Sequence, residues 1–293
     1  MQNVNPVPRT RRTAVWLLLL LSVIPHVSDG ADVEIPKTAR ETYTCEKEER
    51  YFASWSKLAG TLTEEEIVKR VPDSNIESVQ AGDGRVLKGI RIAREKDNKY
   101  ALLIIQGNAW SSRGFSKAVA PFFIVPKLDL FFFDFRGYGL SKPANGSLAA
   151  IVSDYRDIAD WLVRKGYTHL YLYTYSFGGV IALNAFPTLA PFKRVVIDAA
   201  PARLGDFGFK CDPSYDPADK LPKSCPSLVF MHGTTDGVVR RRGVQSLIDS
   251  VRANGGAVDV GQSRGHPFQM EFNSSRKNRV AAIIHHLNLP EDR

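Results

Sequence analysis

Cysteine and long apolar segments are both scarce in this sequence of 293 residues. Its cysteines are Cys45, Cys211 and Cys225, and three cysteines can form no more than one bridge within the chain. The apolar run near the N-terminus covers residues 14–24 and is broken only by Ser22, whereas a helix that spans a bilayer needs about 20 apolar residues. The sequence also has no internal repeat, low-complexity tract or linker. These absences favour one globular domain behind a short leader segment.

Residues 1–30 have the pattern of a secretory signal peptide. Arg9, Arg11 and Arg12 form a basic region ahead of the apolar run, and small residues stand before Ala31. We therefore expect cleavage near Ala31 and a mature chain that is secreted or periplasmic, without stable membrane association. An uncleaved membrane anchor is the alternative.

Residues 31–75 are expected to form an N-terminal extension ahead of a main domain over residues 76–293. Within the extension, Thr63 and Glu66 fit a capping box at the start of a short helix, and Pro72 ends that helix. Nothing in this stretch suggests chemistry.

Basic residues are in excess, with a formal net charge of +8, but they are scattered. The one tight basic cluster is Arg240, Arg241 and Arg242. Three arginines on a surface helix usually form a solvated face rather than a phosphate-binding site. We therefore expect no nucleic-acid partner.

An exported chain can keep a disulfide. Cys211 and Cys225 flank one loop and lie close in sequence, so we expect these two to be bridged and Cys45 to be free. The loop between them is long enough for a short lid. Three reduced thiols are the alternative.

From residue 76 onward, strand and helix patterns alternate. Residues 76–80 and 85–92 flank a turn at residues 81–84, which predicts a hairpin. Short apolar runs typical of strands buried on both faces follow at residues 100–105, 128–135, 169–175, 194–198 and 227–232. Helical patterns lie between them. This alternation predicts an α/β protein with a doubly wound, mostly parallel sheet.

A serine follows the strand predicted at residues 169–175. In the segment 174–179 (TYSFGG), Ser176 stands between that strand and a helical run, with glycines at 178 and 179. This segment resembles the nucleophile elbow, G-x-S-x-G, of the α/β-hydrolase family. The chain departs from the motif at its first position, where Thr174 replaces glycine.

Two later segments resemble the parts of that family that complete a catalytic triad. The segment 232–236 (HGTTD) ends in Asp236, and the segment 263–268 (SRGHPF) presents His266. The resemblance implies that Ser176 is the nucleophile, His266 the base and Asp236 the acid, in the order that the family requires. Asp198, at the end of an earlier strand, is a rival for the acid.

Two further segments extend the resemblance. The segment 104–109 (IIQGNA) is similar to the strand end that supplies half of the oxyanion hole, so the implied donors are the N–H groups of Asn108 and Phe177. The segment 133–141 (FDFRGYGLS) is similar to the family's D-x-R-G-x-G-x-S, which implies a structural role. Five segments in the family's order identify the chain as a member, of the branch with little or no cap domain that includes esterases and serine aminopeptidases.

The resemblance implies a serine hydrolase that cleaves carboxylic esters or thioesters through an acyl-enzyme on Ser176. A small-molecule acyl substrate would enter an apolar pocket, and neither a metal nor another cofactor is implied. The alternatives are a serine aminopeptidase or amidase, and a non-catalytic protein that binds through the same cleft. The residues expected to line the pocket are Trp110, Phe207, Phe209 and Phe268.

Overall fold

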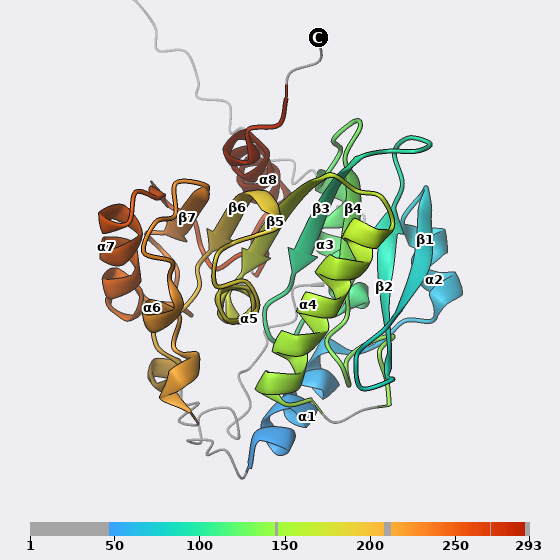
Figure 1. The fold of residues 1–293 in the computed structure, drawn as a ribbon, viewed down its shortest axis with the longest axis horizontal. Helices are drawn as coiled ribbons and strands as arrows, with labels where there is room; N and C mark the ends of the chain where they lie inside the picture. The colour runs from blue at the N-terminus through green and yellow to red at the C-terminus, as the bar shows by residue number, and fades with distance from the viewer. Residues whose placement is uncertain (1–46, 144–145, 208–211, 270, 291–293) are drawn as a thin grey trace, which may run out of the picture.

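An eight-stranded sheet forms the centre of the described fold (Figure 1). The computed structural model describes residues 47–143, 146–207, 212–269 and 271–290. The strands run β1 Ser74–Gln80, β2 Val86–Ile92, β3 Tyr100–Ile105, β4 Asp129–Phe133, β5 His169–Tyr175, β6 Phe192–Asp198, β7 Leu228–Gly233 and β8 Ala257–Gly261. Their spatial order is β1-β2-β4-β3-β5-β6-β7-β8. Pairing is antiparallel at β1–β2 and β2–β4 and parallel elsewhere, which confirms the predicted mostly parallel sheet.

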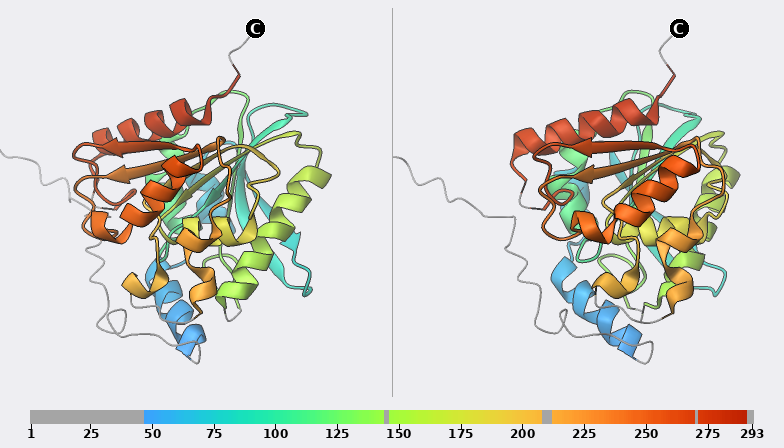
Figure 2. Two further views of the ribbon diagram at one scale, coloured as in Figure 1. Left: turned by 60° about the vertical axis from the view of Figure 1, so that its left-hand side comes forward. Right: turned by 90° about the vertical axis from the view of Figure 1, so that its left-hand side faces the viewer.

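Helices cover both faces of this sheet. They are α1 Glu48–Ala59, α2 Glu64–Arg70, α3 Ser112–Ala118, α4 Leu148–Arg164, α5 Phe177–Ala185, α6 Pro217–Lys220, α7 Gln245–Ala253 and α8 Asn273–Leu287, with short 3-10 helices at Ala120–Phe122, Leu204–Phe207, Pro213–Tyr215 and Arg241–Gly243. Helices α4, α5 and α7 pack on one face, whereas α2, α3 and α8 pack on the other. Figure 2 shows the sheet edge-on between α8 and α7.

The central strands are apolar throughout because both of their faces are buried. In β3, Leu103 and Ile105 contact the α4 side of the core, while Leu102 and Ile104 contact the α8 side. Strand β4 alternates in the same way. The carboxyl ends of the parallel strands therefore meet at one edge of a rigid layer, where sites form in such sheets.

Two elements differ from the predictions. Helix α1 lies in the region expected to be an extension without chemistry, and its Tyr51 and Phe52 are buried in the same core as the sheet. Strand β8 was not predicted, because its edge position leaves most of its residues only partly buried and its sequence (AVDVG) is a weak strand pattern.

The expected signal peptide, residues 1–30, lies outside the described residues, as does Cys45. Within the part that is described, none of the helices has the length and apolar character needed to cross a membrane. Cys211 also lies outside, so the predicted Cys211–Cys225 bridge is not confirmed. Cys225 is a buried free thiol whose Sγ lies 3.9 Å from the carbonyl oxygen of Val251.

The capping box predicted for α2 is confirmed. The N–H of Glu66 donates to Thr63 Oγ1 at 3.1 Å, and the N–H of Thr63 donates to the Glu66 carboxylate at 2.8 Å. These bonds satisfy two N–H groups that a helix start otherwise leaves unpaired.

Replacing Thr63 by alanine is expected to lower the free energy of unfolding by about 1 kcal/mol, because a helix N-cap of this type contributes that much. Chemical denaturation of both proteins measures the change. Thr61→Ala is the matched control, since Thr61 is exposed and precedes the helix. Equal losses in the two variants would contradict a capping role for Thr63.

Candidate active site

Ser176 lies on a sharp turn between β5 and α5. Its backbone has φ 53° and ψ −124°, a region that residues with a side chain rarely adopt. The N–H of Ser176 donates to the carbonyl oxygen of Asp198 at 2.8 Å, and the N–H of Gly179 donates to the carbonyl oxygen of Ser176 at 3.0 Å. These bonds hold the strained turn, and the serine side chain stays partly exposed.

Glycine is needed after the serine because backbones approach closely there. A Cβ at Gly178 would lie 2.3 Å from the carbonyl oxygen of Ile105, and one at Gly179 would lie 2.4 Å from Ala200 Cβ. The position two residues before the serine tolerates a larger side chain. Thr174 is fully buried in β5, with an Oγ1 that has no partner among the described residues, and the sharp turn forms with it in place.

Asp236 and His266 form a buried pair beyond the ends of β7 and β8. His266 Nδ1 lies 2.9 Å from Asp236 Oδ2, and each residue is 6% exposed. The other oxygen of Asp236 accepts the N–H groups of Val238 and Val239, both at 2.8 Å. Burial alone would raise the pKa of Asp236, but the hydrogen bonds from His266 and from these N–H groups hold it below its usual value. Asp236 is thus ionised and keeps the imidazole in one orientation.

Asp198, the rival for the acid, has a different partner. Its Oδ2 accepts a hydrogen bond of 2.6 Å from Arg279 on α8 and one of 3.2 Å from the Tyr173 hydroxyl. Both charged residues are buried, with Asp198 at 0% and Arg279 at 1% exposure. The carboxylate of Asp198 is therefore used in an ion pair, and the carboxylate that contacts His266 is that of Asp236.

Arg279 also holds the loop that carries His266. Its Nη2 donates to the carbonyl oxygen of Gly265 at 2.6 Å and to the Glu271 carboxylate at 2.7 Å. Glu271 in turn accepts the N–H of Phe268 at 2.9 Å. Gly265, directly before the histidine, and Phe268, two residues after it, are thus held in place by Arg279 and its partner Glu271.

A continuous set of contacts brings that loop to the serine. The backbone carbonyl oxygen of Asp198 accepts the Ser176 N–H, and the Asp198 carboxylate accepts a hydrogen bond from Arg279. The Phe268 ring packs against that of Tyr175, with centroids 5.5 Å apart, beside the nucleophile position. The structure thus brings Ser176, Asp236 and His266 to the same edge of the sheet, beyond the carboxyl ends of β5, β7 and β8.

The predicted oxyanion donors flank this position. A Cβ at Gly107 would lie 3.0 Å from Ser176 Cβ, so the loop carrying Asn108 passes close to the serine. The N–H of Asn108 and that of Phe177 donate to none of the residues described in the structure. Both groups are thus available to a bound oxygen atom.

The segment 133–141 anchors the loop next to these donors. The buried carboxylate of Asp134 accepts the Ser112 N–H at 2.6 Å, the Ser112 hydroxyl at 2.7 Å and the Leu140 N–H at 2.8 Å. Burial raises the pKa of Asp134 to about 6, although these hydrogen bonds oppose the rise. Its contacts tie the loop after β4 to the start of α3, which is the structural role that was expected.

The four residues predicted to line a pocket fall into two groups. Trp110 and Phe268 lie together, with ring centroids 6.2 Å apart, but both are buried in the core beside Tyr175. They form packed support for the site rather than an open lining. Phe207 lies in a short 3-10 helix, and Phe209 lies outside the described residues.

Sequence reasoning missed Arg279 and the role of Tyr51, whose hydroxyl accepts a 2.7 Å hydrogen bond from Asn108 Nδ2. It also gave no role to His232, a buried residue whose ring nitrogens have no partner among the described residues and whose pKa is lowered by burial. The apolar spacing of Tyr51, Phe52 and Trp55 was a readable helix signal. Arg279 is one of several basic residues in α8, and nothing in its own segment distinguishes it from them. Within the described ranges, no group of three acidic, histidine or cysteine side chains could hold a metal ion.

Comparison with known proteins agrees with this geometry. A model of the alpha/beta hydrolase family matches residues 102–272, more than half of the sequence, and the chain belongs to that family. A search of curated proteins finds no significant match. Membership of the family supports an enzyme that hydrolyses a small-molecule substrate.

Solved structures with similar folds include three hydrolases. An esterase of Pyrococcus furiosus aligns with a TM-score of 0.61 and 15% identity, over 78% of this chain and 96% of that chain. A Xanthomonas campestris protein, described as an α/β serine hydrolase without a lid, aligns with a TM-score of 0.54 and 19% identity, over 76% and 98%. A puromycin-hydrolysing peptidase of Mycobacterium tuberculosis aligns at 0.56 with 12% identity, over 73% and 38%. At these identities the similarity shows the fold.

Replacing Arg279 by methionine is expected to lower the free energy of unfolding by about 3–5 kcal/mol, because Asp198 and Glu271 would stay buried without their partner. Lys277→Met is the matched control on the same helix, and since Lys277 is exposed its loss should stay within about 0.5 kcal/mol. Denaturant titration followed by circular dichroism compares the two. A loss for Arg279→Met as small as that of the control would contradict the assigned ion pairs.

Proposed function

We propose that the protein is a serine hydrolase that cleaves carboxylic ester or thioester bonds through an acyl-enzyme on Ser176. The observation that carries the proposal is the strained turn at Ser176 together with the buried Asp236–His266 pair on the same sheet edge. The fold shared with an esterase and with a lidless serine hydrolase favours small acyl substrates.

The contact of His266 with Asp236 supports different roles for its two nitrogens. Nδ1 faces Asp236, so Nε2 is the nitrogen that takes the proton from Ser176 Oγ as this oxygen attacks the acyl carbon. The ionised Asp236 stabilises the imidazolium that forms. His266 then gives its proton to the leaving alcohol or thiol. A water molecule next attacks the acyl carbon as His266 takes one of its protons, and His266 returns that proton to Ser176 Oγ as the carboxylic acid leaves.

The charge on the attacked carbonyl oxygen would be met by the N–H groups of Asn108 and Phe177. Such donors act mainly on the transition state, and the loss of one typically costs about 3–4 kcal/mol. Phe177 begins α5, so the positive end of that helix dipole points to the same place.

Amide or peptide hydrolysis is the second candidate, because the same three groups can expel an amine. It is favoured by one observation, the fold shared with a puromycin-hydrolysing peptidase. A panel of p-nitrophenyl esters, acyl thioesters and aminoacyl amides tests the choice, and faster turnover of the amides would favour this second candidate.

A fluorophosphonate probe is expected to label the wild-type protein and to leave Ser176→Ala unlabelled, because the probe reacts with an activated serine hydroxyl. His266→Ala should lose nearly all labelling, since the two groups act as a unit. Asp236→Asn should keep a residual rate. Intact mass spectrometry measures the adduct.

Ser214→Ala is the control for these variants, because Ser214 is an exposed serine in a short 3-10 helix and belongs to none of the triad segments. If the folded wild-type protein takes up no probe, the proposed hydrolase is wrong and the chain is a binding protein of the same fold. If Ser176→Ala is labelled as fast as the wild type, another residue is the nucleophile.

The rate of probe labelling is expected to fall on acidification, because only a neutral imidazole can accept the serine proton. Asp236 should not contribute to this fall, since its pKa is held below its usual value and it stays ionised. Labelling rates between about pH 4 and 9 give the profile. A flat profile would contradict a histidine base.

A further inference from the structure

Helix α1 lies over the end of the sheet where Ser176 is placed. Figure 1 shows α1 at the bottom of the view, on the side toward which β3 and β5 point. At its first turn, the Glu48 carboxylate accepts a 2.5 Å hydrogen bond from the N–H of Leu148, at the start of α4. At its last turn, Ser111 Oγ lies 3.1 Å from the carbonyl oxygens of both Ala59 and Gly60. The helix is thus fixed at both ends by the segments that follow β3 and β4.

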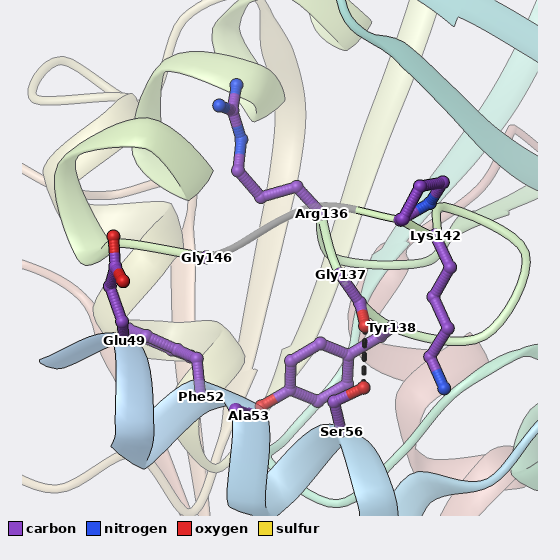
Figure 3. A pocket seen from close by; sticks show the side chains of 10 residues that line it. Glu49, Phe52, Ala53, Ser56, Arg136, Gly137, Tyr138, Lys142 and Gly146 are labelled. Atoms are coloured by element: carbon purple, nitrogen blue, oxygen red, sulfur yellow. Dashed lines mark hydrogen bonds between the residues drawn. The ribbon is translucent and has the colours of Figure 1, made fainter.

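The middle of α1 contacts the loop after β4 at a small pocket of about 270 Å³ (Figure 3). Ser56 Oγ donates to the carbonyl oxygen of Gly137 at 2.5 Å, and Phe52 and Tyr138 line the same pocket from the two sides. Since α1 is bonded at its start, middle and end, the side chains on its buried face have fixed positions.

Two of those side chains contact the side chains of Asn108 and Phe177, whose N–H groups are the predicted oxyanion donors. The Tyr51 hydroxyl accepts the Asn108 Nδ2 hydrogen bond at 2.7 Å, and Tyr51 is 5% exposed. The Phe177 ring lies 6.4 Å from the Tyr51 ring and 5.9 Å from the Phe52 ring, measured between centroids. Helix α1 is therefore the element that joins the two halves of the oxyanion hole.

We propose that Tyr51 is a positioning residue that fixes the Asn108 N–H for catalysis, so that α1 is part of the active site. The inference rests on the function proposed above. Asn108 is followed by Ala109 at φ 59°, in a loop that no strand pairing restrains. The Tyr51 bond to the Asn108 side chain limits rotation of that residue and hence the direction of its N–H.

The direction of the N–H matters because the oxygen of the transition state, not that of the bound substrate, must meet it. Donors fixed in advance need no reorganisation during the reaction. A misplacement of about 1 Å can cost on the order of 100-fold in rate. Loss of the Tyr51 bond should therefore lower kcat and leave KM nearly unchanged. If α1 only covered the core, loss of the same bond would change neither kcat nor KM.

Tyr51→Phe is the direct test, in the full-length protein with a p-nitrophenyl ester that the wild type hydrolyses. We expect kcat to fall about 10-fold, with KM within about 2-fold of the wild type, because the altered interaction is stronger in the transition state. Asn108→Ala should give a similar fall, and the double variant should lose no more than either single change, since both remove the same bond.

Two controls separate this bond from general effects. Tyr138→Phe removes a hydroxyl that is buried nearby and has no partner among the described residues, so it should leave kcat within about 2-fold of the wild type. Ser56→Ala removes a contact of α1 that does not involve Asn108 and leaves the helix bonded at both ends, so it should have a similarly small effect. Thermal unfolding confirms that each variant is folded at the assay temperature.

The outcomes distinguish this inference from the proposed function. A wild type whose activity does not depend on Ser176 overturns both. A Ser176-dependent activity that Tyr51→Phe leaves unchanged overturns the positioning role alone, as does an equal fall in Tyr51→Phe and Ser56→Ala. A fall in kcat confined to Tyr51→Phe and Asn108→Ala, without additivity, supports it.

Discussion

The buried ion pair between Asp198 and Arg279 joins the two ends of the site. Asp198 ends β6 and accepts the Ser176 N–H with its backbone, while Arg279 on α8 holds Gly265, the residue before His266. Nucleophile and base come from segments far apart in the sequence, so their relative position depends on this connection. Burying such charges is costly unless every partner is present. The Glu271 carboxylate completes the set by accepting from the same guanidinium and from the loop itself.

The sheet could be predicted from the sequence because burial on both faces leaves a strong signal. The runs at residues 100–105 and 169–175 coincide with β3 and β5. Such runs need no knowledge of what packs on them, since any parallel strand at the centre of a sheet is apolar throughout. Edge strand β8 pairs with β7 but lacks that signal, because most of its residues are only partly buried.

The candidate site divides in the same way. Ser176, Asp236 and His266 stand in short local motifs, and the structure places them on one edge of the sheet. Contacts that depend on tertiary packing were missed, such as those of Arg279 and Tyr51, because nothing in their own segments indicates a partner some 50 to 80 residues away. Trp110 and Phe268 were expected to line a pocket but are packed in the core. An aromatic residue near a site looks the same in sequence in either position.

The position of α1 near the start of the chain bears on how the protein can be subdivided. The family match begins at residue 102, and the first strand of the sheet begins at Ser74. A shortened gene designed on either boundary would encode every residue of the serine–histidine–aspartate set and still omit Tyr51, the partner of Asn108. A shortened form that is to be compared with the full-length protein should therefore keep α1. A proteolytic nick between α1 and α2 would leave the triad intact in sequence and remove the covalent link between Tyr51 and the loop that carries Asn108.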